Sequence, residues 1–396
     1  MRSNKQKINK NFIGKKINKY FFNNFNTTSP NFIIMLLSVF IGVLGLFILL
    51  SATSYLTIKY NLSRYHYFIR QGIYLIVGIF LMFLISKIDY KLYHKYAYIF
   101  YIASIFLLLM IFVPGLSSRI KGARRILNIG ISFMPSDIVK ISTILCLSRF
   151  MIDNKKYYNN FFKSVLPTGL LILLPIGLIM LQPDLSTSIV IIVTLAIVYL
   201  VNGFNYKFFL PIFLVGIALV IFAATNLKGY QLDRITAFLN PEEHYEHLSW
   251  QVLNGLFAIS RGGLFGVGYG KSIYKQGYLA DEVSNDMIFS VFGEEFGFIG
   301  SVLFIILVIT IALLIFNEAI KSKNKFAKSV CFGIGTLYLL QSLINIGVSL
   351  SLIPNTGITL PFVSNGGTSL IVFYIMFGIV LNISRENNYI KNENKK

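Results

Sequence analysis

Charged residues are scarce in this sequence, and acidic residues are the scarcest. Only 13% of the 396 residues are charged, with 16 acidic residues against 36 lysines and arginines, whereas 55% are hydrophobic. The mean hydropathy is +0.68. This composition leaves too little charge to cover the surface of a soluble protein of this length, and it therefore indicates an integral membrane protein.

Cysteine is also nearly absent, which excludes a disulfide framework. The two cysteines, Cys146 and Cys331, both fall inside apolar runs, where a thiol behaves as a small hydrophobic group. A signal-peptide cleavage site is lacking as well, because the first 30 residues are polar and basic and no small-residue site precedes the first apolar run. We expect this segment to be a retained cytoplasmic tail.

Apolar runs long enough to cross a membrane fill most of the chain. A hydrocarbon core about 30 Å thick requires about 20 residues of helix. Runs near this length predict an all-α, polytopic fold of about ten transmembrane helices between basic tails at 1–30 and 385–396. The ten-helix domain is 31–384, with a long extracytoplasmic loop at 227–286 between helices 7 and 8. The predicted spans are 31–52, 68–88, 96–114, 137–152, 164–182, 186–202, 207–226, 287–316, 327–352 and 362–384.

The distribution of lysine and arginine predicts that both termini are cytoplasmic. Basic residues concentrate in the two tails and in the short loop 321–328, which the positive-inside rule assigns to the cytoplasm. Most of the net charge of +20 is therefore topological. Contact with anionic lipid is favoured over nucleic-acid binding, and we expect no nucleic-acid partner.

One outward loop is basic where the positive-inside rule predicts few cations. It contains Arg119, Lys121, Arg124 and Arg125. Neighbouring guanidinium groups can form bidentate hydrogen bonds with phosphate oxygens, so a pyrophosphate would suit this loop. Contact with lipid headgroups explains the cluster equally well.

The span that follows this loop contains a charged pair. Ser136 is predicted to cap the helix, and Asp137 is favourable at its positive end. Lys140 is costly inside an apolar span unless it is paired, and Asp137 lies three residues earlier on the same helix face. We expect the two side chains to form an ion pair.

Two further segments have mainly structural interpretations. In the turn that contains Gln182 and Asp184, the aspartate is expected to cap the next helix rather than to act in catalysis. The glycine-rich stretch 262–272 superficially resembles a nucleotide-binding P-loop, but the motif requires glycine where Phe265 stands. The stretch also faces outward, so we expect no bound nucleotide.

Three acids surround the outer end of the span 287–316. Asp286 directly precedes it, and Glu294 and Glu295 lie inside it, so the three are predicted to converge on one entrance to the membrane. Ionisable groups at such positions are functional candidates, and a carboxylate there can serve as a general base. For the two glutamates, structural pairing with Lys140 or Arg261 is an equal alternative.

Together these motifs resemble the SEDS family (shape, elongation, division and sporulation proteins), in order and over nearly the whole chain. Ser51-Ala52-Thr53 and the spacing of Gly268, Gly270, Ser272 and Lys275 are closer to the division branch, FtsW, than to the elongation branch, RodA. The segments that carry the resemblance are Gly122-Ala123-Arg124-Arg125, Pro135-Ser136-Asp137 with Lys140, Gln182-Pro183-Asp184, Gly262 to Ser272, Asp286 with Glu294-Glu295, and Leu360 to Gly367.

The resemblance implies an inverting peptidoglycan glycosyltransferase that polymerises lipid II at the outer face of the bacterial cytoplasmic membrane. Its implied partners are a class B penicillin-binding transpeptidase and divisome membrane proteins. Asp286 is the implied catalytic residue, as general base or as ligand of a divalent cation (Mg²⁺ or Mn²⁺). The implied substrate-binding residues are Lys121, Arg124, Arg125, Asp137, Lys140 and Ser364, supported by Gln182, Asp184, Lys275, Glu294 and Glu295.

The sequence departs from the family pattern close to the implied site. The His-Thr-Asp-Phe motif reads Ser284-Asn285-Asp286-Met287, Asp137 replaces a glutamate, and Asn365 replaces a tyrosine. Three alternatives remain at this point: a flippase for lipid-linked precursors, an elongation polymerase of the RodA type, and a non-catalytic scaffold for the division machinery.

Overall fold

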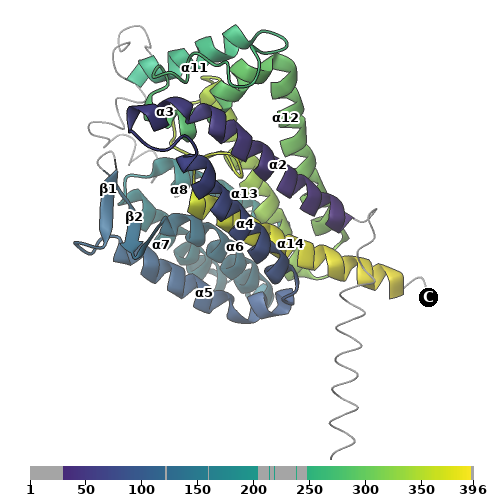
Figure 1. Ribbon diagram of the computed structural model, residues 1–396. Coiled ribbons are helices and arrows are strands. Elements are labelled where there is room, and N and C mark those ends of the chain that lie inside the picture. The colour runs from purple at the N-terminus through teal and green to yellow at the C-terminus, as the bar shows by residue number, and fades with distance from the viewer. Residues whose placement is uncertain are drawn as a thin grey trace, which may run out of the picture.

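The computed structural model describes residues 30–120, 123–158, 160–203 and 248–393, together with three single positions between 204 and 247. Long helices pack side by side in one bundle (Figure 1). Helix α11 (Leu248–Gly262) and the strands β1 (Ser117–Ile120) and β2 (Ala123–Ile129) lie at the end of the bundle away from the C terminus.

Helices occupy nine of the ten predicted spans, and the tenth, 207–226, lies outside the described residues apart from single positions. Seven helices are long and apolar enough to cross a membrane by length and composition. The all-α prediction is therefore confirmed for this part of the chain. The nine helices are α2 Pro30–Ala52, α4 His66–Ser86, α5 Tyr90–Met110, α6 Pro135–Asp153, α7 Leu166–Met180, α8 Leu185–Val201, α12 Ile288–Lys321, α13 Lys325–Ser349 and α14 Gly367–Glu393.

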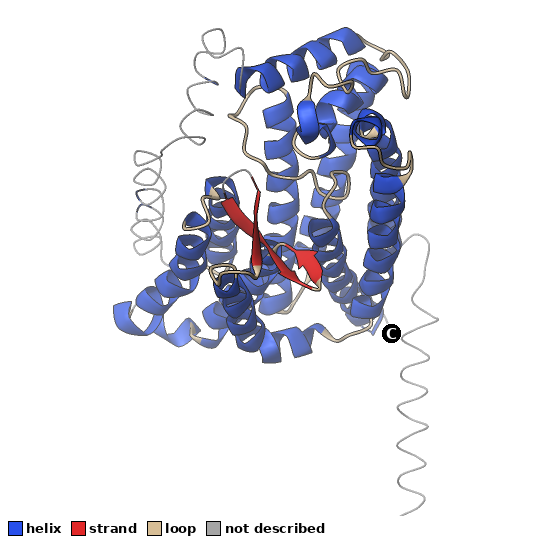
Figure 2. Ribbon diagram, turned by 60° about the vertical axis from the view of Figure 1, so that its left-hand side comes forward, coloured by secondary structure: helices blue, strands red, loops and turns tan. Residues whose placement is uncertain are grey.

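Hydropathy did not predict the small elements between the spans. The basic outward loop folds into a three-stranded antiparallel sheet, visible among the helices in Figure 2. The predicted loop 227–286 includes a 15-residue helix, and α14 continues past the predicted boundary at 384. The additional elements are α3 Ser54–Lys59, β1 Ser117–Ile120, β2 Ala123–Ile129, β3 Ile131–Phe133 and α11 Leu248–Gly262.

Polar contacts explain why α14 extends beyond its apolar run. Asn387 donates a hydrogen bond from Nδ2 to the backbone oxygen of Glu318 on α12 (3.0 Å). Glu386 forms an ion pair with Lys91 at the start of α5 (3.7 Å). The C-terminal turns are therefore held by neighbouring helices, which a hydropathy window does not detect.

The segment between α13 and α14 enters the core of the bundle. Phe362 has a φ of 67°, a left-handed conformation that is costly for a residue with a side chain. Its ring packs against Tyr338 and Phe377, with centroid distances of 5.9 and 5.0 Å. On α2, Gly45 permits the approach, because a Cβ there would lie 2.7 Å from the backbone oxygen of Phe362.

Helix α12 is broken at Gly297, which has φ 68° and ψ −167°. A continuous helix would bond the N–H groups of residues 298 and 299 to the carbonyls of residues 294 and 295. Instead, the loop 263–268 supplies partners to both sides of the break. The bonds are Phe298 N to Gly263 O (2.8 Å), Ile299 N to Leu264 O (3.1 Å), Val267 N to Glu294 O (3.0 Å) and Gly268 N to Glu295 O (3.1 Å).

Replacing Gly266 with alanine should destabilise the protein more than replacing Gly270. Both glycines have positive φ, 82° and 80°, so each alanine carries a conformational cost of about 1–2 kcal/mol. A Cβ at position 266 would also lie 2.2 Å from the backbone oxygen of Glu295, whereas one at 270 would have nothing within 4 Å. We expect this overlap to add about 1–3 kcal/mol to the loss. Thermal unfolding in detergent measures the difference, and equal midpoints would contradict the close packing of this loop on α12.

Candidate active site

Asp286 is held by its backbone at the C-terminal end of α13. Its carbonyl oxygen accepts hydrogen bonds from Asn345 Nδ2 (3.3 Å) and Ser349 Oγ (3.4 Å), and the residue is only 7% exposed. Asn345 Nδ2 also donates to the backbone oxygen of Ile358 (2.8 Å). One amide side chain on α13 therefore connects the candidate catalytic residue to the segment that precedes α14.

Ser364 also lies beside Asp286, but its hydroxyl group is occupied by the backbone. It donates to Asn285 O (2.7 Å) and accepts from the N–H of Leu360 (2.8 Å). The backbone N–H of Asn365 donates to Ser284 O (2.8 Å). Ser364 therefore holds the segment that carries Asp286, and its contact with substrate stays a prediction.

The predicted ion pair between Lys140 and Asp137 is confirmed. Lys140 Nζ lies 2.8 Å from Asp137 Oδ1 and donates a second hydrogen bond to Gln341 Oε1 (3.2 Å). Gln341 and Asn345 are four residues apart and therefore share one face of α13. Lys140 and the backbone of Asp286 consequently contact neighbouring positions on the same helix.

The start of α6 differs from the prediction by two residues. The N-cap is Met134 and Pro135 is the first helical residue, so Ser136 lies inside the first turn and is not the cap. The N–H of Met134 donates to Thr368 Oγ1 (3.2 Å), so the helix start is held by α14 instead. Asp137 does lie in the first turn, as predicted.

The sheet separates Arg124 from Arg125. Both are on β2, where successive side chains point to opposite faces. Arg125 donates a hydrogen bond to Pro183 O and forms an ion pair with Asp184 (3.7 Å). In the strand register Arg124 lies opposite Arg119. Binding of a pyrophosphate by this loop stays a prediction, and Lys121 lies outside the described residues.

Asp184 is a helix cap, as the sequence predicted. Its Oδ1 accepts from Thr187 N (3.2 Å) and its Oδ2 accepts from Thr187 Oγ1 (2.9 Å), at the start of α8. The ion pair with Arg125 adds a contact to the sheet. Gln182 is buried in the same turn. These residues therefore join the sheet to α8.

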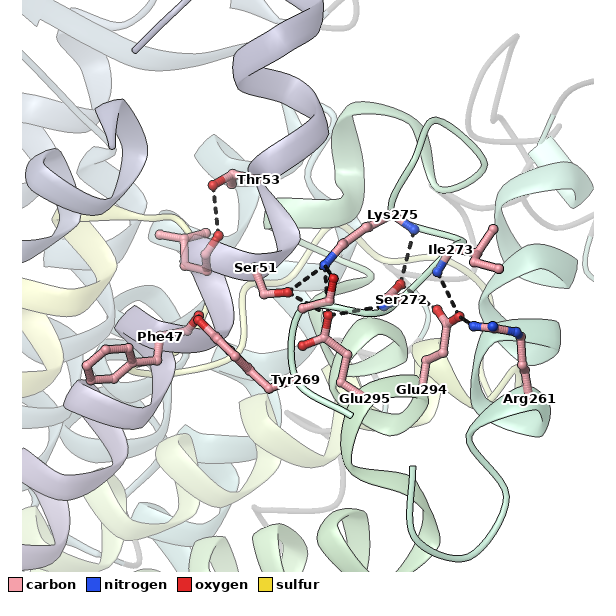
Figure 3. A network of polar contacts seen from close by, with 12 residues as sticks. Phe47, Ser51, Thr53, Arg261, Tyr269, Ser272, Ile273, Lys275, Glu294 and Glu295 are labelled. Carbon is pink, nitrogen blue, oxygen red and sulfur yellow. Dashed lines mark hydrogen bonds and ion pairs between the residues drawn. The ribbon is translucent and has the colours of Figure 1, made fainter. Parts of the chain in front are cut away.

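Glu294 is bound by the loop that precedes α12. Its carboxylate accepts hydrogen bonds from Arg261 Nη1, Ser272 Oγ and the backbone N–H of Ile273, the last at 2.9 Å (Figure 3). The residue is fully buried. Structural pairing with Arg261, one of the two expected alternatives, is what the structure contains.

Glu295 is bound from two sides. Lys275 Nζ lies 2.9 Å from Glu295 Oε1 and also donates to Ser51 Oγ (2.7 Å), while Ser51 donates to the same carboxylate oxygen (Figure 3). Lys275 Nζ donates a further hydrogen bond to Gly270 O (2.8 Å). The two carboxylates are thus bound by the loop, whereas the backbone of Asp286 is bound by α13. The predicted convergence of the three acids on one membrane entrance stays a prediction.

Tyr269 closes the same loop against α2. Its hydroxyl group donates to Phe47 O (2.9 Å). Burial, together with the negative charge of Glu295, raises the pKa of Tyr269 above its ordinary value. The phenol therefore remains a neutral hydrogen-bond donor at physiological pH.

The described residues contain no group of three or more His, Cys, Asp or Glu side chains that could hold a metal ion. Mg²⁺ is commonly bound by one or two carboxylates together with waters and substrate phosphates. A divalent cation at Asp286 therefore stays a prediction.

Several residues of this region were missed by the sequence interpretation. They are uncharged polar side chains buried inside apolar spans. Their signal was available, because polar residues at membrane depth are costly and usually have a specific partner. These residues are Gln71, Gln341, Asn345 and Ser349.

Comparison with known proteins places the chain in a family. Residues 31–389 match the family of cell cycle proteins that comprises FtsW, RodA and SpoVE. The chain belongs to this family. It is 35% identical over 352 residues to a probable peptidoglycan glycosyltransferase FtsW of Coxiella burnetii, which covers 87% of this chain and 93% of the relative. It is 31% identical over 364 residues to stage V sporulation protein E of Bacillus subtilis, covering 91% of this chain and 99% of the relative.

Solved structures of this family have the same fold. A chain of a peptidoglycan synthase complex matches with a TM-score of 0.72 and 25% identity, covering 89% of this chain and 97% of that one. The rod shape-determining protein RodA of Thermus thermophilus matches with a TM-score of 0.66 and 26% identity, covering 89% and 96%. The SEDS resemblance is thus confirmed, and the protein is a multi-pass bacterial membrane protein.

The two roles of Asp184 can be separated by substitution. Asp184→Ala removes both the cap and the charge, so it should lower stability by about 1 kcal/mol for the cap and more for the partner lost to Arg125. Asp184→Asn keeps a capping oxygen and removes only the charge. We expect its unfolding midpoint in detergent to lie between those of the wild type and Asp184→Ala. Equal losses in the two variants would contradict the importance of the cap.

Proposed function

We propose that this protein is a peptidoglycan glycosyltransferase that polymerises lipid II at the outer face of the cytoplasmic membrane, for septal synthesis in cell division. The observation that carries this proposal is the buried Asp286, held by its backbone at the end of α13. The names of the relatives support the reaction class and the division role, since they include probable peptidoglycan glycosyltransferases FtsW.

The proposed reaction is a single displacement at the donor sugar. The 4-hydroxyl group of the acceptor attacks the anomeric carbon of a lipid-diphosphate donor, and the bond between that carbon and the diphosphate oxygen breaks with inversion. The carboxylate of Asp286 accepts the hydroxyl proton as general base, and polyprenyl diphosphate leaves. The donor supplies the energy, so no nucleotide is required.

The basic side chains at the same end of the bundle would bind the diphosphate. Arg124 on β2 is the proposed phosphate contact, and its backbone lies opposite that of Arg119 in the strand register. Arg125 would act indirectly, because its contacts with Pro183 and Asp184 fix the position of the hairpin. Lys140 is neutralised by Asp137, so it would orient polar groups near the donor rather than supply net charge.

The orientation of the chain and its partners are also part of the proposal. Lys155, Lys156, Lys323 and Lys325 lie at the ends of α6, α12 and α13 that are opposite to Asp286. The positive-inside rule assigns those ends, and both termini, to the cytoplasm. A class B penicillin-binding transpeptidase is the proposed partner, which agrees with the similarity to a chain of a peptidoglycan synthase complex. Divisome membrane proteins would recruit the pair.

Asp286→Ala should abolish glycan polymerisation by the purified protein with its transpeptidase partner and lipid II. Loss of a general base reduces the rate by about 10²–10⁴-fold. Asp153→Asn is the control. Asp153 is the last residue of α6, at the end of the bundle opposite to Asp286, so this variant should polymerise normally. Gel analysis of labelled glycan chains measures the product. Normal polymerisation by Asp286→Ala would refute the assignment of the base.

The rival functions predict different results in vesicles and in cells. A flippase would move labelled lipid between the leaflets of a vesicle without forming polymer, and Asp286→Ala would affect transport alone. A scaffold would support division in cells even as Asp286→Ala. An elongation polymerase would form glycan but would localise along the side wall, whereas a division polymerase localises at the septum.

A further inference from the structure

The break at Gly297 decides where Asp286 lies. Helices α12 and α13 are joined by the short turn 322–324 and run in opposite directions from it. Gly297 on α12 and Ser349, the last residue of α13, are equally far from this turn along their helices, so they lie opposite each other. If α12 continued straight, Asp286 would lie eleven residues, or about 16 Å, beyond the end of α13. Its carbonyl oxygen instead lies 3.4 Å from Ser349 Oγ. The N-terminal part of α12, 288–296, is therefore turned back over the end of the bundle.

The turned part of α12 is held by two sets of polar side chains, which we call the α12 clasp. The clasp consists of Ser51, Arg261, Ser272, Lys275, Glu294 and Glu295. One set joins Arg261 and Ser272 to Glu294. The other joins Lys275 and Ser51 to Glu295 (Figure 3). Both glutamates lie just before the break, so the clasp acts on the part of the helix that carries Asp286.

Burial makes the clasp selective for one geometry. Lys275 and Glu295 are only 4% and 2% exposed, and Glu294 is completely buried. A buried ion pair gains little over well-packed apolar residues, but removing one partner leaves an uncompensated charge and is strongly destabilising. Any other direction of the part of α12 that precedes Gly297 would separate these charges. The cost of separation therefore keeps the helix in the turned position.

The chain between the clasp and Asp286 is short. Ten residues separate Lys275 from Asp286. The end of this stretch next to Asp286 is bound to the segment before α14, because Ser364 donates a hydrogen bond to Asn285 O and the N–H of Asn365 donates to Ser284 O. Movement of the loop at Lys275 would therefore be transmitted to Asp286 both through the chain and through α12.

We propose that Lys275 and Arg261 are positioning residues that hold Asp286 in place through Glu295 and Glu294 without contacting substrate. Lys275 donates three hydrogen bonds, to Glu295, Ser51 and Gly270, which are all the donors that an ammonium group has. None remains for a ligand. The consequence for catalysis depends on the proposed function of Asp286, whereas the consequence for loop position does not.

Lys275→Met should lower kcat in the lipid II polymerisation assay with the transpeptidase partner by tenfold or more and change KM by less than about twofold. Displacement of a catalytic group by about 1 Å can cost about 10²-fold in rate, while substrate contacts are unchanged. Lys271→Met is the matched control, because Lys271 is exposed in the same loop and should behave as wild type. Ser51→Ala removes only one hydroxyl from the clasp, so it should fold normally and show a smaller loss of kcat in the same direction.

A distance measurement tests the positioning independently of activity. Spin labels at Gln276 and Leu352 report the separation between the loop and the end of α13, since both positions are exposed and the native cysteines can be replaced by alanine. Wild type and Lys271→Met should give one narrow distance distribution. Lys275→Met should give a broader or shifted one, and Ser51→Ala a smaller change.

The two measurements distinguish the outcomes. An unchanged distribution in Lys275→Met and Ser51→Ala overturns the proposal, whether or not kcat falls. A broadened distribution with an unchanged kcat also overturns it, because the loop would then move without displacing the base. If the wild type forms no polymer, the proposed function fails, and the distance distribution alone still decides whether the clasp holds the loop.

Discussion

The structure depends on an exchange of hydrogen bonds at Gly297. A broken helix in a membrane protein must satisfy the backbone groups that the break exposes, because no water is available at membrane depth to do so. Here the loop 263–268 supplies four partners, two on each side of the break. Gly266 and Gly297 permit the required approach, since a Cβ at either position would lie within 2.3 Å of the opposing backbone. The direction of the outer part of α12, and with it the position of Asp286, follows from this exchange.

A second set of contacts holds the site from the opposite side. The segment before α14 enters the bundle with Phe362 in a left-handed conformation, and strain of this kind persists only where surrounding packing determines it. Asn345 and Gln341 on α13 link this segment to Asp286 and to Lys140. Asp286 therefore lies between two independently constrained pieces of backbone, which suits a group that must keep a fixed orientation during reaction.

Much of the candidate site could be predicted from the sequence, because charge in an apolar span requires a partner. The pairing of Lys140 with Asp137 and the capping role of Asp184 were predicted from spacings of three residues and from helix chemistry. The roles of Arg124 and Arg125 could not be predicted in the same way. Their separation onto opposite faces depends on a strand conformation, and residues that are adjacent in sequence carry no signal of it when the flanking chain is read as a loop.

Hydropathy by itself determined the membrane environment, the helical class and the approximate position of nine of the spans, because the cost of exposing backbone and charge to lipid acts on each segment locally. Tertiary structure alone decided which groups bind each of the three acids. Glu294, Glu295 and Asp286 look alike in sequence, being carboxylates near one membrane entrance. They differ only because the break at Gly297 brings the glutamates to Arg261 and Lys275, residues more than 19 positions away, and carries the backbone of Asp286 to α13.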